Sequence, residues 1–148
     1  MSIKSALHQV LEKIGLRRRS TSSADTKNID PRKTLGKAGE DFALALLQQR
    51  GHKLVARNVL FKRGELDLVT WQGQTLVFTE VRTRSGMAFG TPAESVNARK
   101  QASVRRAAHT FLSRTFKDGR LPDCRFDIVW LLAQDGRIME SGVIEGAF

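Results

Sequence analysis

Two acidic residues and an arginine stand inside apolar segments of this 148-residue chain. Asp67 lies in GELDLVTW, and Glu80 and Arg82 lie in LVFTEVRTR with the spacing acid-x-base. A buried carboxylate is costly unless it is paired or bound to a cation. Two carboxylates suit a hard cation such as Mg²⁺, which would stabilise the charge of a phosphoryl transition state. The pattern favours metal-assisted hydrolysis of phosphodiesters.

A structural ion pair is the alternative explanation of the same residues. Arg82 would then neutralise Asp67 or Glu80 on a half-exposed sheet, as structural pairs commonly do. The order of the residues favours the functional explanation: an acid, a hairpin turn, then acid-x-base at the strand period of two.

Residues 64–84 predict a β-hairpin that positions these side chains. Two runs of strand formers flank Gln72-Gly73-Gln74, which supplies the turn glycine. If Gln72-Gly73 is a two-residue turn, position 67 faces position 78 and position 65 faces position 80. Asp67 and Glu80 are then diagonal neighbours, roughly 7–8 Å apart at Cα, and one ion can bridge them. A different turn would change this register.

The composition indicates a single domain that binds a polyanion. The chain has 25 Lys and Arg against 15 Asp and Glu, a net charge of +10, which favours nucleic acid or an anionic membrane surface as partner. One cysteine excludes an intrachain disulfide and a cysteine-cluster zinc site. We find no GxxxxGK[ST] loop and no long apolar run or secretory signal, so we expect a cytoplasmic protein.

The first 33 residues are predicted to be an extension of the domain that spans residues 34–148. Residues 2–19 have the pattern of an amphipathic helix that ends in three arginines, and residues 20–33 are a polar linker. The arginines are explained by ordinary helix capping, or by contact with phosphate or lipid head groups. Residues 1–33 carry 8 basic and 3 acidic residues, so the remaining chain is basic without them.

Residues 34–50 predict a helix whose packed side includes Leu35, Phe42 and Leu46. Glu40 falls near the predicted beginning of this helix, where the helix dipole favours an acid. Alternatively, Glu40 faces the site of Asp67 and Glu80.

A second helix is predicted to carry a basic face. Thr91-Pro92-Ala93-Glu94 has the spacing of a capping box, and Asn97 offers a second start for a helix that runs to about residue 116. Its exposed cations are predicted to contact phosphates without reading sequence. The candidate phosphate-binding residues are Arg84, Arg99, Lys100 and Arg106.

The remaining segments are predicted to be structural. Residues 53–60, 124–132 and 138–144 are expected to be strands, the last one at an edge, and Asp135-Gly136 is a turn. Cys124 is interpreted as a small buried residue and Asp127 as structural. The three histidines show no metal-binding spacing.

Several linked motifs resemble one known family. The segments GKAGEDFALALL, GELDLV, LVFTEVRTR and FGTPAESVNARKQASVRRAA are similar to the YraN family of small bacterial proteins, over about residues 34–132. This family lies within the restriction-endonuclease-like PD-(D/E)xK superfamily and is similar in fold to archaeal Holliday-junction resolvases. The resemblance implies an α/β fold, a central mixed sheet of four to five strands flanked by helices.

The resemblance also implies roles for individual residues. Glu40, Asp67 and Glu80 would hold Mg²⁺ or Mn²⁺, and Arg82 stands where the family pattern has lysine. Arginine keeps the positive charge but is not deprotonated in proteins. We therefore expect a DNA-binding protein, a metal-dependent endonuclease of branched DNA that would act as a homodimer. The alternatives are a non-catalytic nucleic-acid-binding module and a membrane-surface adaptor that binds through residues 2–19.

Overall fold

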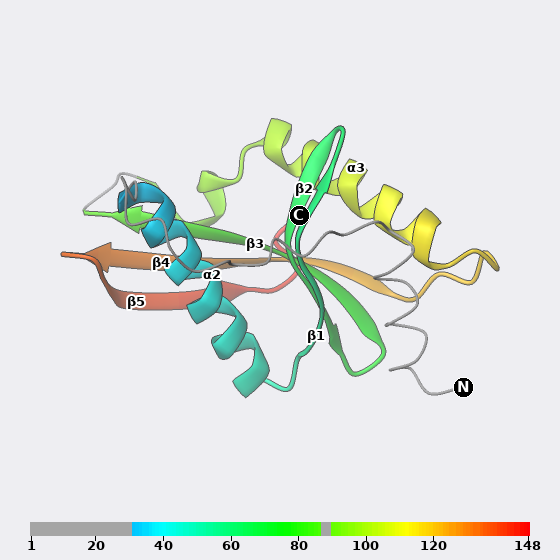
Figure 1. The fold of residues 1–148 in the computed structure, drawn as a ribbon, viewed down its shortest axis with the longest axis horizontal. Helices are drawn as coiled ribbons and strands as arrows, with labels where there is room; N and C mark the ends of the chain where they lie inside the picture. Colours follow the sequence, from blue (N-terminus) through cyan, green and yellow to red (C-terminus); the bar gives the residue numbers. More distant parts are fainter. Residues whose placement is uncertain (1–30, 87–89) are drawn as a thin grey trace, which may run out of the picture.

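The computed structural model describes residues 31–86 and 90–148, which form a five-stranded mixed sheet with a helix on each face (Figure 1). The strand order is β1-β2-β3-β4-β5, and only the β3–β4 pair is parallel. This is the predicted restriction-endonuclease-like arrangement. The elements are α2 (Pro31–Gln49), β1 (Lys53–Phe61), β2 (Gly64–Gln72), β3 (Thr75–Ser85), the short 3₁₀ turn η1 (Ala93–Ser95), α3 (Ala98–Thr115), β4 (Cys124–Gln134) and β5 (Arg137–Ile144).

The predicted helix at residues 2–19 and most of the predicted linker lie outside the described residues. The linker's last three residues are helical, because α2 begins at Pro31 rather than at residue 34. Proline is well suited to the first turn of a helix, where its missing N–H costs nothing. No helix in the described ranges is long and apolar enough to cross a membrane.

The earlier start of α2 changes the explanation of Glu40. This residue lies in the middle of the helix, and the first turn contains no acid, so the interpretation of Glu40 as a dipole-stabilised N-terminal acid is wrong. The packed side of α2 also differs from the prediction. Ala43 and Leu47 are buried against Leu68 and strand β4, whereas Phe42 is 40% exposed.

Helix α3 provides the crossover that the parallel pair β3–β4 requires. Its residues Val104, Ala107, Ala108 and Phe111 are buried in the larger core, where Phe111 meets the ring of Phe78 edge to face. The two helices therefore cover opposite faces of the sheet and give it a core on each side.

Both predicted starts before α3 are used. Thr91 and Glu94 form a capping box: the Thr91 N–H donates to Glu94 Oε2 at 2.6 Å, and the Glu94 N–H donates to Thr91 Oγ1 at 3.3 Å. This box closes only the turn η1. The long helix starts later, where Asn97 Oδ1 accepts from the Lys100 N–H at 2.9 Å. Because the helix starts at this second cap, Lys100 lies in the first turn of α3.

The β2–β3 turn differs from the predicted one. Gln72 pairs with Thr75, so Gly73-Gln74 form the turn, with Gly73 at φ 60°. The register moves by two positions, and Asp67 and Glu80 directly follow the last pair, Leu68 with Thr79. Both residues therefore lie one position beyond the last paired residues of their strands, rather than in the predicted diagonal register.

The C-terminal hairpin confirms one residue assignment and corrects another. Asp127 is fully buried and structural, since it accepts two bonds of 2.8 Å from Arg125 and one of 3.0 Å from the Gly146 N–H. Cys124 is exposed, not buried, because it is the first residue of β4 and lies at the end of the sheet.

Candidate active site at the fork of the sheet

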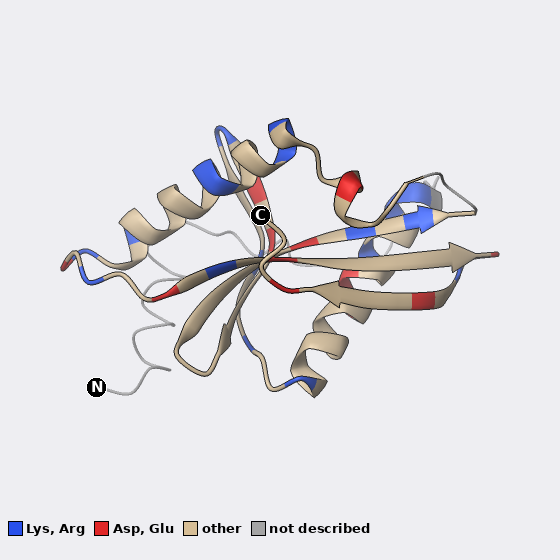
Figure 2. Cartoon of the chain, turned by 180° about the vertical axis from the view of Figure 1, so that it is seen from behind, with Lys and Arg blue, Asp and Glu red and all other residues tan. Residues whose placement is uncertain are grey.

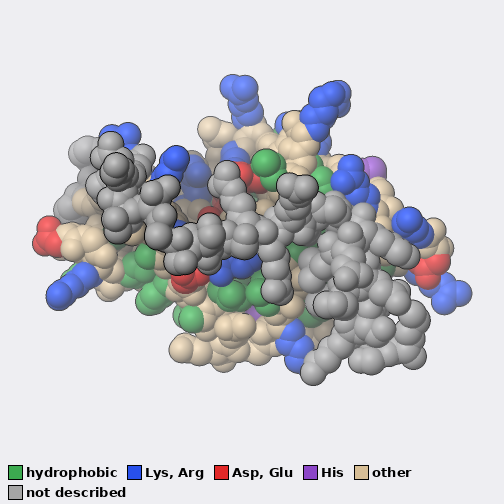
Figure 3. All heavy atoms as spheres, viewed as in Figure 1, with side chains coloured by type: hydrophobic (Ala, Val, Ile, Leu, Met, Phe, Trp, Pro, Cys, Tyr) green, Lys and Arg blue, Asp and Glu red, His purple; other side chains and the backbone are tan. Residues whose placement is uncertain are grey.

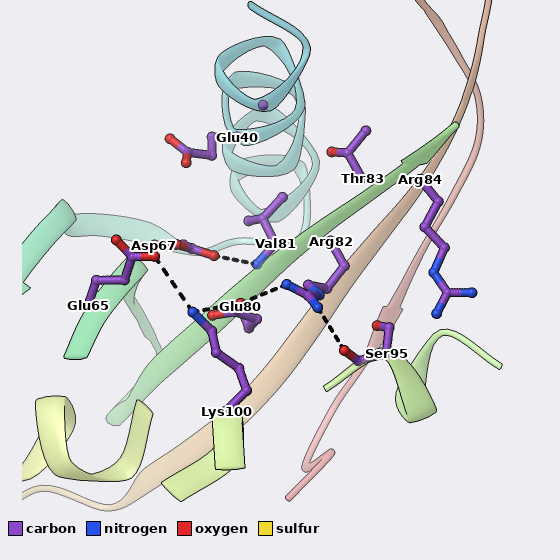
Figure 4. Close-up of a pocket in the computed structure, with 11 residues that line it drawn as sticks. Glu40, Glu65, Asp67, Glu80, Val81, Arg82, Thr83, Arg84, Ser95 and Lys100 are labelled. Atoms are coloured by element: carbon purple, nitrogen blue, oxygen red, sulfur yellow. Dashed lines mark hydrogen bonds and ion pairs between the residues drawn. The ribbon is translucent and has the colours of Figure 1, made fainter. Parts of the chain in front are cut away.

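The candidate site is a pocket where β2 and β3 separate. The ladder between them ends at the Leu68–Thr79 pair, while β3 continues alongside β4 to Ser85. Figure 1 shows β1 and β2 running across the direction of β3, β4 and β5. Helix α2 closes one side of the fork and α3 the other (Figure 4). The pocket has a volume of about 490 Å³ and is lined by Gly36, Glu40, Glu65, Asp67, Glu80, Val81, Arg82, Thr83, Arg84, Ser95 and Lys100.

Asp67 occupies the point at which the ladder stops. Its Oδ2 accepts a 2.8 Å hydrogen bond from the backbone N–H of Val81. The carboxylate thereby satisfies a strand donor that has no backbone partner on β2, since a buried N–H needs an acceptor. The same carboxyl group lines the pocket, so one side chain both ends the ladder and contributes to the site.

Glu80 is the most buried acid of the pocket, with 2% of its surface exposed. Its Oε1 lies 3.4 Å from Lys100 Nζ and 3.7 Å from Arg82 Nη1. Its Oε2 is buried and has no hydrogen-bond partner among the described residues. An unpartnered carboxylate oxygen beside a second carboxylate fits a hard divalent cation, which proteins bind through one or two carboxylates while substrate and water complete the shell.

Burial makes ionisation of both carboxyl groups costly. Burial raises the pKa of Asp67 to about 7, and the negative charge of Glu80 contributes in the same direction. Burial also raises the pKa of Glu80, although the ammonium of Lys100 opposes the rise. Near neutral pH the carboxyl group of Asp67 is therefore partly protonated when no cation is bound. A bound cation would displace that proton.

Glu40 reaches the pocket from α2 but is partly engaged elsewhere. Its Oε2 lies 3.6 Å from Arg57 Nη2, and the same nitrogen donates to Asp41 Oδ1 at 2.8 Å. Across the ranges 31–86 and 90–148, no three His, Cys, Asp or Glu side chains lie close enough together to form a metal cluster. Asp67 and Glu80 are thus the close pair, and Glu40 as a third ligand stays a prediction.

Arg82 contacts the carboxylate pair less closely than its place in the acid-x-base motif suggests. Its Nη2 donates to the backbone carbonyl of Ser95 at 2.8 Å, which ties β3 to the turn η1. Its other terminal nitrogen is the one near Glu80, at 3.7 Å. The guanidinium therefore lies at the pocket wall, held by a backbone acceptor.

Lys100 enters the site from the first turn of α3. Its Nζ lies between Glu80 Oε1 and Glu65 Oε1, at 3.4 and 3.6 Å (Figure 4). The basic pattern of the helix predicts Lys100 only as an exposed phosphate contact, and the sequence analysis missed its pairing with Glu80. Glu65 is not predicted as a pocket residue either, although it shares a strand face with Asp67.

Of the other predicted phosphate-binding residues, one lines the pocket and two lie outside it. Arg84 lines it, and its Nη1 donates to the Gly90 carbonyl at 3.4 Å. Arg99 and Arg106 are exposed on α3, outside the pocket lining. Figure 2 shows acidic positions near the centre of the molecule with basic positions on β3 and α3 around them. Figure 3 shows Lys and Arg side chains projecting along the edge that α3 forms.

Comparison with known proteins assigns the chain to a family. The model of "Uncharacterised protein family UPF0102" matches residues 39–131, which include both carboxylates of the pair, Arg82 and Lys100. A UPF0102 protein of Moorella thermoacetica is 45% identical over 119 residues, covering 79% of this chain and 97% of the relative. UPF0102 proteins of Symbiobacterium thermophilum and Pseudomonas savastanoi are each 43% identical, and the alignments cover 77% and 79% of this chain and 95% and 94% of the relatives. The chain belongs to the UPF0102 family, the YraN family that its sequence motifs resemble.

Proposed function

We propose that this protein binds DNA and hydrolyses phosphodiester bonds at branched sites with the help of Mg²⁺ or Mn²⁺. The observation that supports this most is the Asp67–Glu80 pair, two adjacent carboxyls at an open fork, one of them with an unpartnered buried oxygen. A structural ion pair would leave no such oxygen, because unsatisfied buried polar atoms are costly.

Asp67 and Glu80 would hold the metal, and Glu40 faces the same space from α2. The bound cation supplies Lewis-acid stabilisation of a phosphoryl group and lowers the pKa of water. The chain's own cations have a separate task. Arg82, Arg84 and Lys100 line the pocket and offset the repulsion between a DNA phosphate and the acids.

Binding outside the pocket would be to the DNA backbone. Arg99 and Arg106 are exposed on the face of α3 beyond the pocket, and the whole chain carries a net charge of +10. Contacts of this kind fix the position of a duplex without reading its sequence. Selection of branched DNA, the substrate of the resolvases to which the family is similar in fold, would then depend on DNA shape.

The test is cleavage of labelled four-way-junction, flap and linear duplex DNA with Mg²⁺ or Mn²⁺. Wild type is compared with Asp67→Ala, Glu80→Ala and Arg82→Lys. We expect wild type to cut junctions or flaps, and Arg82→Lys to cut them as well. Both alanine variants should cleave at least about 100-fold more slowly, the scale expected when charge stabilisation of the transition state is lost. Cleavage by Asp67→Ala at the wild-type rate would show that the nuclease is a contaminant.

A second candidate is a nucleic-acid-binding module without catalysis. It is supported by the hydrogen bond from Arg82 to the Ser95 carbonyl, because a guanidinium held by the backbone is less available to a phosphate. It predicts salt-sensitive DNA binding that survives Asp67→Ala, with no metal-dependent nicking of any substrate. The same panel of proteins and DNAs separates the two candidates.

A further inference from the structure

The structure points to a division of labour between the two cations nearest Glu80. We propose that Lys100 is a substrate-contacting residue, whose ammonium holds the phosphodiester beside the Asp67–Glu80 pair, and that Arg82 instead anchors the turn η1. This inference rests on the proposed function, because it names which chain cation meets the phosphate at that site.

The geometry of Lys100 leaves its ammonium available to a ligand. Its distances of 3.4 Å to Glu80 and 3.6 Å to Glu65 are longer than the roughly 2.7–2.9 Å of a charge-assisted hydrogen bond. An ammonium has three N–H donors. The side chain is 27% exposed, so solvent and ligands reach it. Lys100 is thus held loosely between two acids, inside the pocket, with donors to spare.

The position of Lys100 is fixed by the way in which helix α3 starts and packs. The N-cap Asn97 sets the first turn of α3, and its side chain accepts the N–H of Lys100 itself at 2.9 Å. One turn further on, Val104 is buried in the core under the sheet. The helix therefore presents position 100 to the fork while the adjacent Arg99 is exposed.

Arg82 has a different set of partners. Its 2.8 Å bond to the Ser95 carbonyl is the shortest contact that it makes to a pocket residue, and it connects β3 with η1. Gln101 reinforces the same region by donating to the Val96 carbonyl at 3.0 Å. We expect loss of Arg82 to loosen residues 93–96 before it affects the carboxylate pair.

The first test needs no DNA. Mn²⁺ affinity is measured by electron paramagnetic resonance for wild type, Lys100→Gln and Lys117→Gln. In Lys100→Gln the new amide can still donate to Glu80 but carries no charge, so we expect Mn²⁺ to bind about tenfold more tightly once the neighbouring cation is gone. Lys117 is exposed just after α3, outside the pocket lining, and its variant should bind Mn²⁺ like wild type. An unchanged Mn²⁺ affinity in Lys100→Gln would overturn the proposal, whether or not the protein cuts DNA.

The second test separates the roles of the two cations by single-turnover cleavage at saturating junction DNA. Lys100→Gln should lower the rate by about 100-fold or more, with Lys100→Arg intermediate, because one group that stabilises developing charge is removed. Arg82→Gln should lower the saturated rate by less than about tenfold and speed hydrogen exchange at residues 93–96. Equal rate losses in the Lys100→Gln and Arg82→Gln variants, or a wild-type rate in Lys100→Gln, would refute the division of labour.

The two proposals fail in different ways. If wild type cuts no DNA, the proposed nuclease function fails, and the Mn²⁺ titration alone decides whether Lys100 adjoins the cation site. If wild type cuts and Lys100→Gln cuts equally well, the function stands and the assignment of Lys100 falls. Far-ultraviolet circular dichroism on every variant excludes unfolding as the cause of either result.

Discussion

The chemistry of the candidate site depends on a carboxyl pair that costs stability while it lacks a cation. The Asp67 side chain replaces a missing backbone acceptor for Val81, and Glu80 is buried with one oxygen unpartnered. Such groups persist in folded proteins when function requires them, since replacing them would stabilise the chain. Residue-scale predictions therefore concern stability with and without metal.

Asp67→Asn should stabilise the metal-free protein at neutral pH. The folded-state pKa of Asp67 is raised from 3.8 to about 7, so between these values the native state binds more protons than the unfolded state, and stability falls as pH rises. Asparagine keeps the acceptor for the Val81 N–H but has no charge. We expect the free energy of unfolding of Asp67→Asn to exceed that of wild type by about 1–2 kcal/mol above pH 7, a figure discounted for partial exposure and for the coupling to Glu80. This difference should shrink as the pH approaches 4.

This prediction is checked by urea unfolding in excess chelator across that pH window. The control is Asp118→Asn, a change to an acid in an exposed loop outside the pocket lining. A stability gain of Asp67→Asn that is the same at pH 4 and at pH 8 would contradict the mechanism.

Divalent cations should make wild type more stable than Asp67→Asn. A ligand that binds only the folded state stabilises it by about 1.4 kcal/mol at ten times its dissociation constant. We expect Mn²⁺ to raise the melting temperature of wild type and to leave Asp67→Asn and Glu80→Gln nearly unchanged. Differential scanning fluorimetry with increasing Mn²⁺ measures this. Equal shifts in all three proteins would place the cation elsewhere on the chain.

The residues of the pair can be found from the sequence, but their partners cannot. Charged side chains in apolar strands stand out because burial of a charge is costly. The pairing of Lys100 depends on which of two helix starts is used, and both are chemically sound N-terminal signals. Thr91-Pro92-Ala93-Glu94 closes the short turn, while Asn97 starts the helix. Only tertiary packing distinguishes them.

At the scale of elements, α2 contains two glycines whose surroundings predict opposite effects. Gly36 is exposed, with no atom within 4 Å of the place that an added methyl group would take, so Gly36→Ala should stabilise the helix by about 0.5–1 kcal/mol. Gly39 is buried against the side chain of Thr83 on β3, where an added methyl would collide. Gly39→Ala should therefore destabilise the protein by about 1–3 kcal/mol, the usual cost of overpacking.

Thermal and urea unfolding of the two alanine variants provide the comparison, each serving as the control for the other. The helix propensity gained is the same at both positions, so the difference reports the close approach of α2 to β3. If both variants were stabilised alike, α2 would not pack against Thr83. Because Gly36 lines the pocket, a parallel Mn²⁺ titration checks that the added methyl leaves the metal pair intact.

The hairpin shows where the prediction of elements from sequence reaches its limit. The strands themselves follow from β-branched and aromatic residues at a period of two, and all five are predicted. The register of the hairpin cannot be predicted in this way. Gly73 can be the second residue of a Gln72-Gly73 turn or the first residue of a Gly73-Gln74 turn, and no local preference distinguishes the two turns. The observed turn at Gly73-Gln74 places Asp67 and Glu80 each one position beyond the last paired residues of β2 and β3. A shift of two positions preserves the face of every side chain, which explains why the predicted pair still meets.

For the whole molecule, the order of strands follows from chain connectivity, but the fork does not. Tight turns make β1–β2, β2–β3 and β4–β5 antiparallel, and α3 makes β3–β4 parallel. Where β2 leaves β3 depends on the twist of the sheet and on two cores of unequal size. The pocket and its neutralising cations are consequences of that divergence, which no short stretch of sequence encodes.

The charge of the whole molecule predicts how DNA binding depends on salt. Each phosphate contact released changes the slope of log K against log salt by about 0.9 for B-form DNA. Arg99→Gln plus Arg106→Gln should therefore make the slope shallower by roughly 1–2, while Arg137→Gln, on the exposed β5 edge, should leave it unchanged. Fluorescence anisotropy with a junction duplex at several salt concentrations measures these slopes. If Arg137→Gln, which removes one charge, changed the slope by half as much as the double variant, binding would reflect diffuse net charge rather than the face of α3 beside the carboxylate fork.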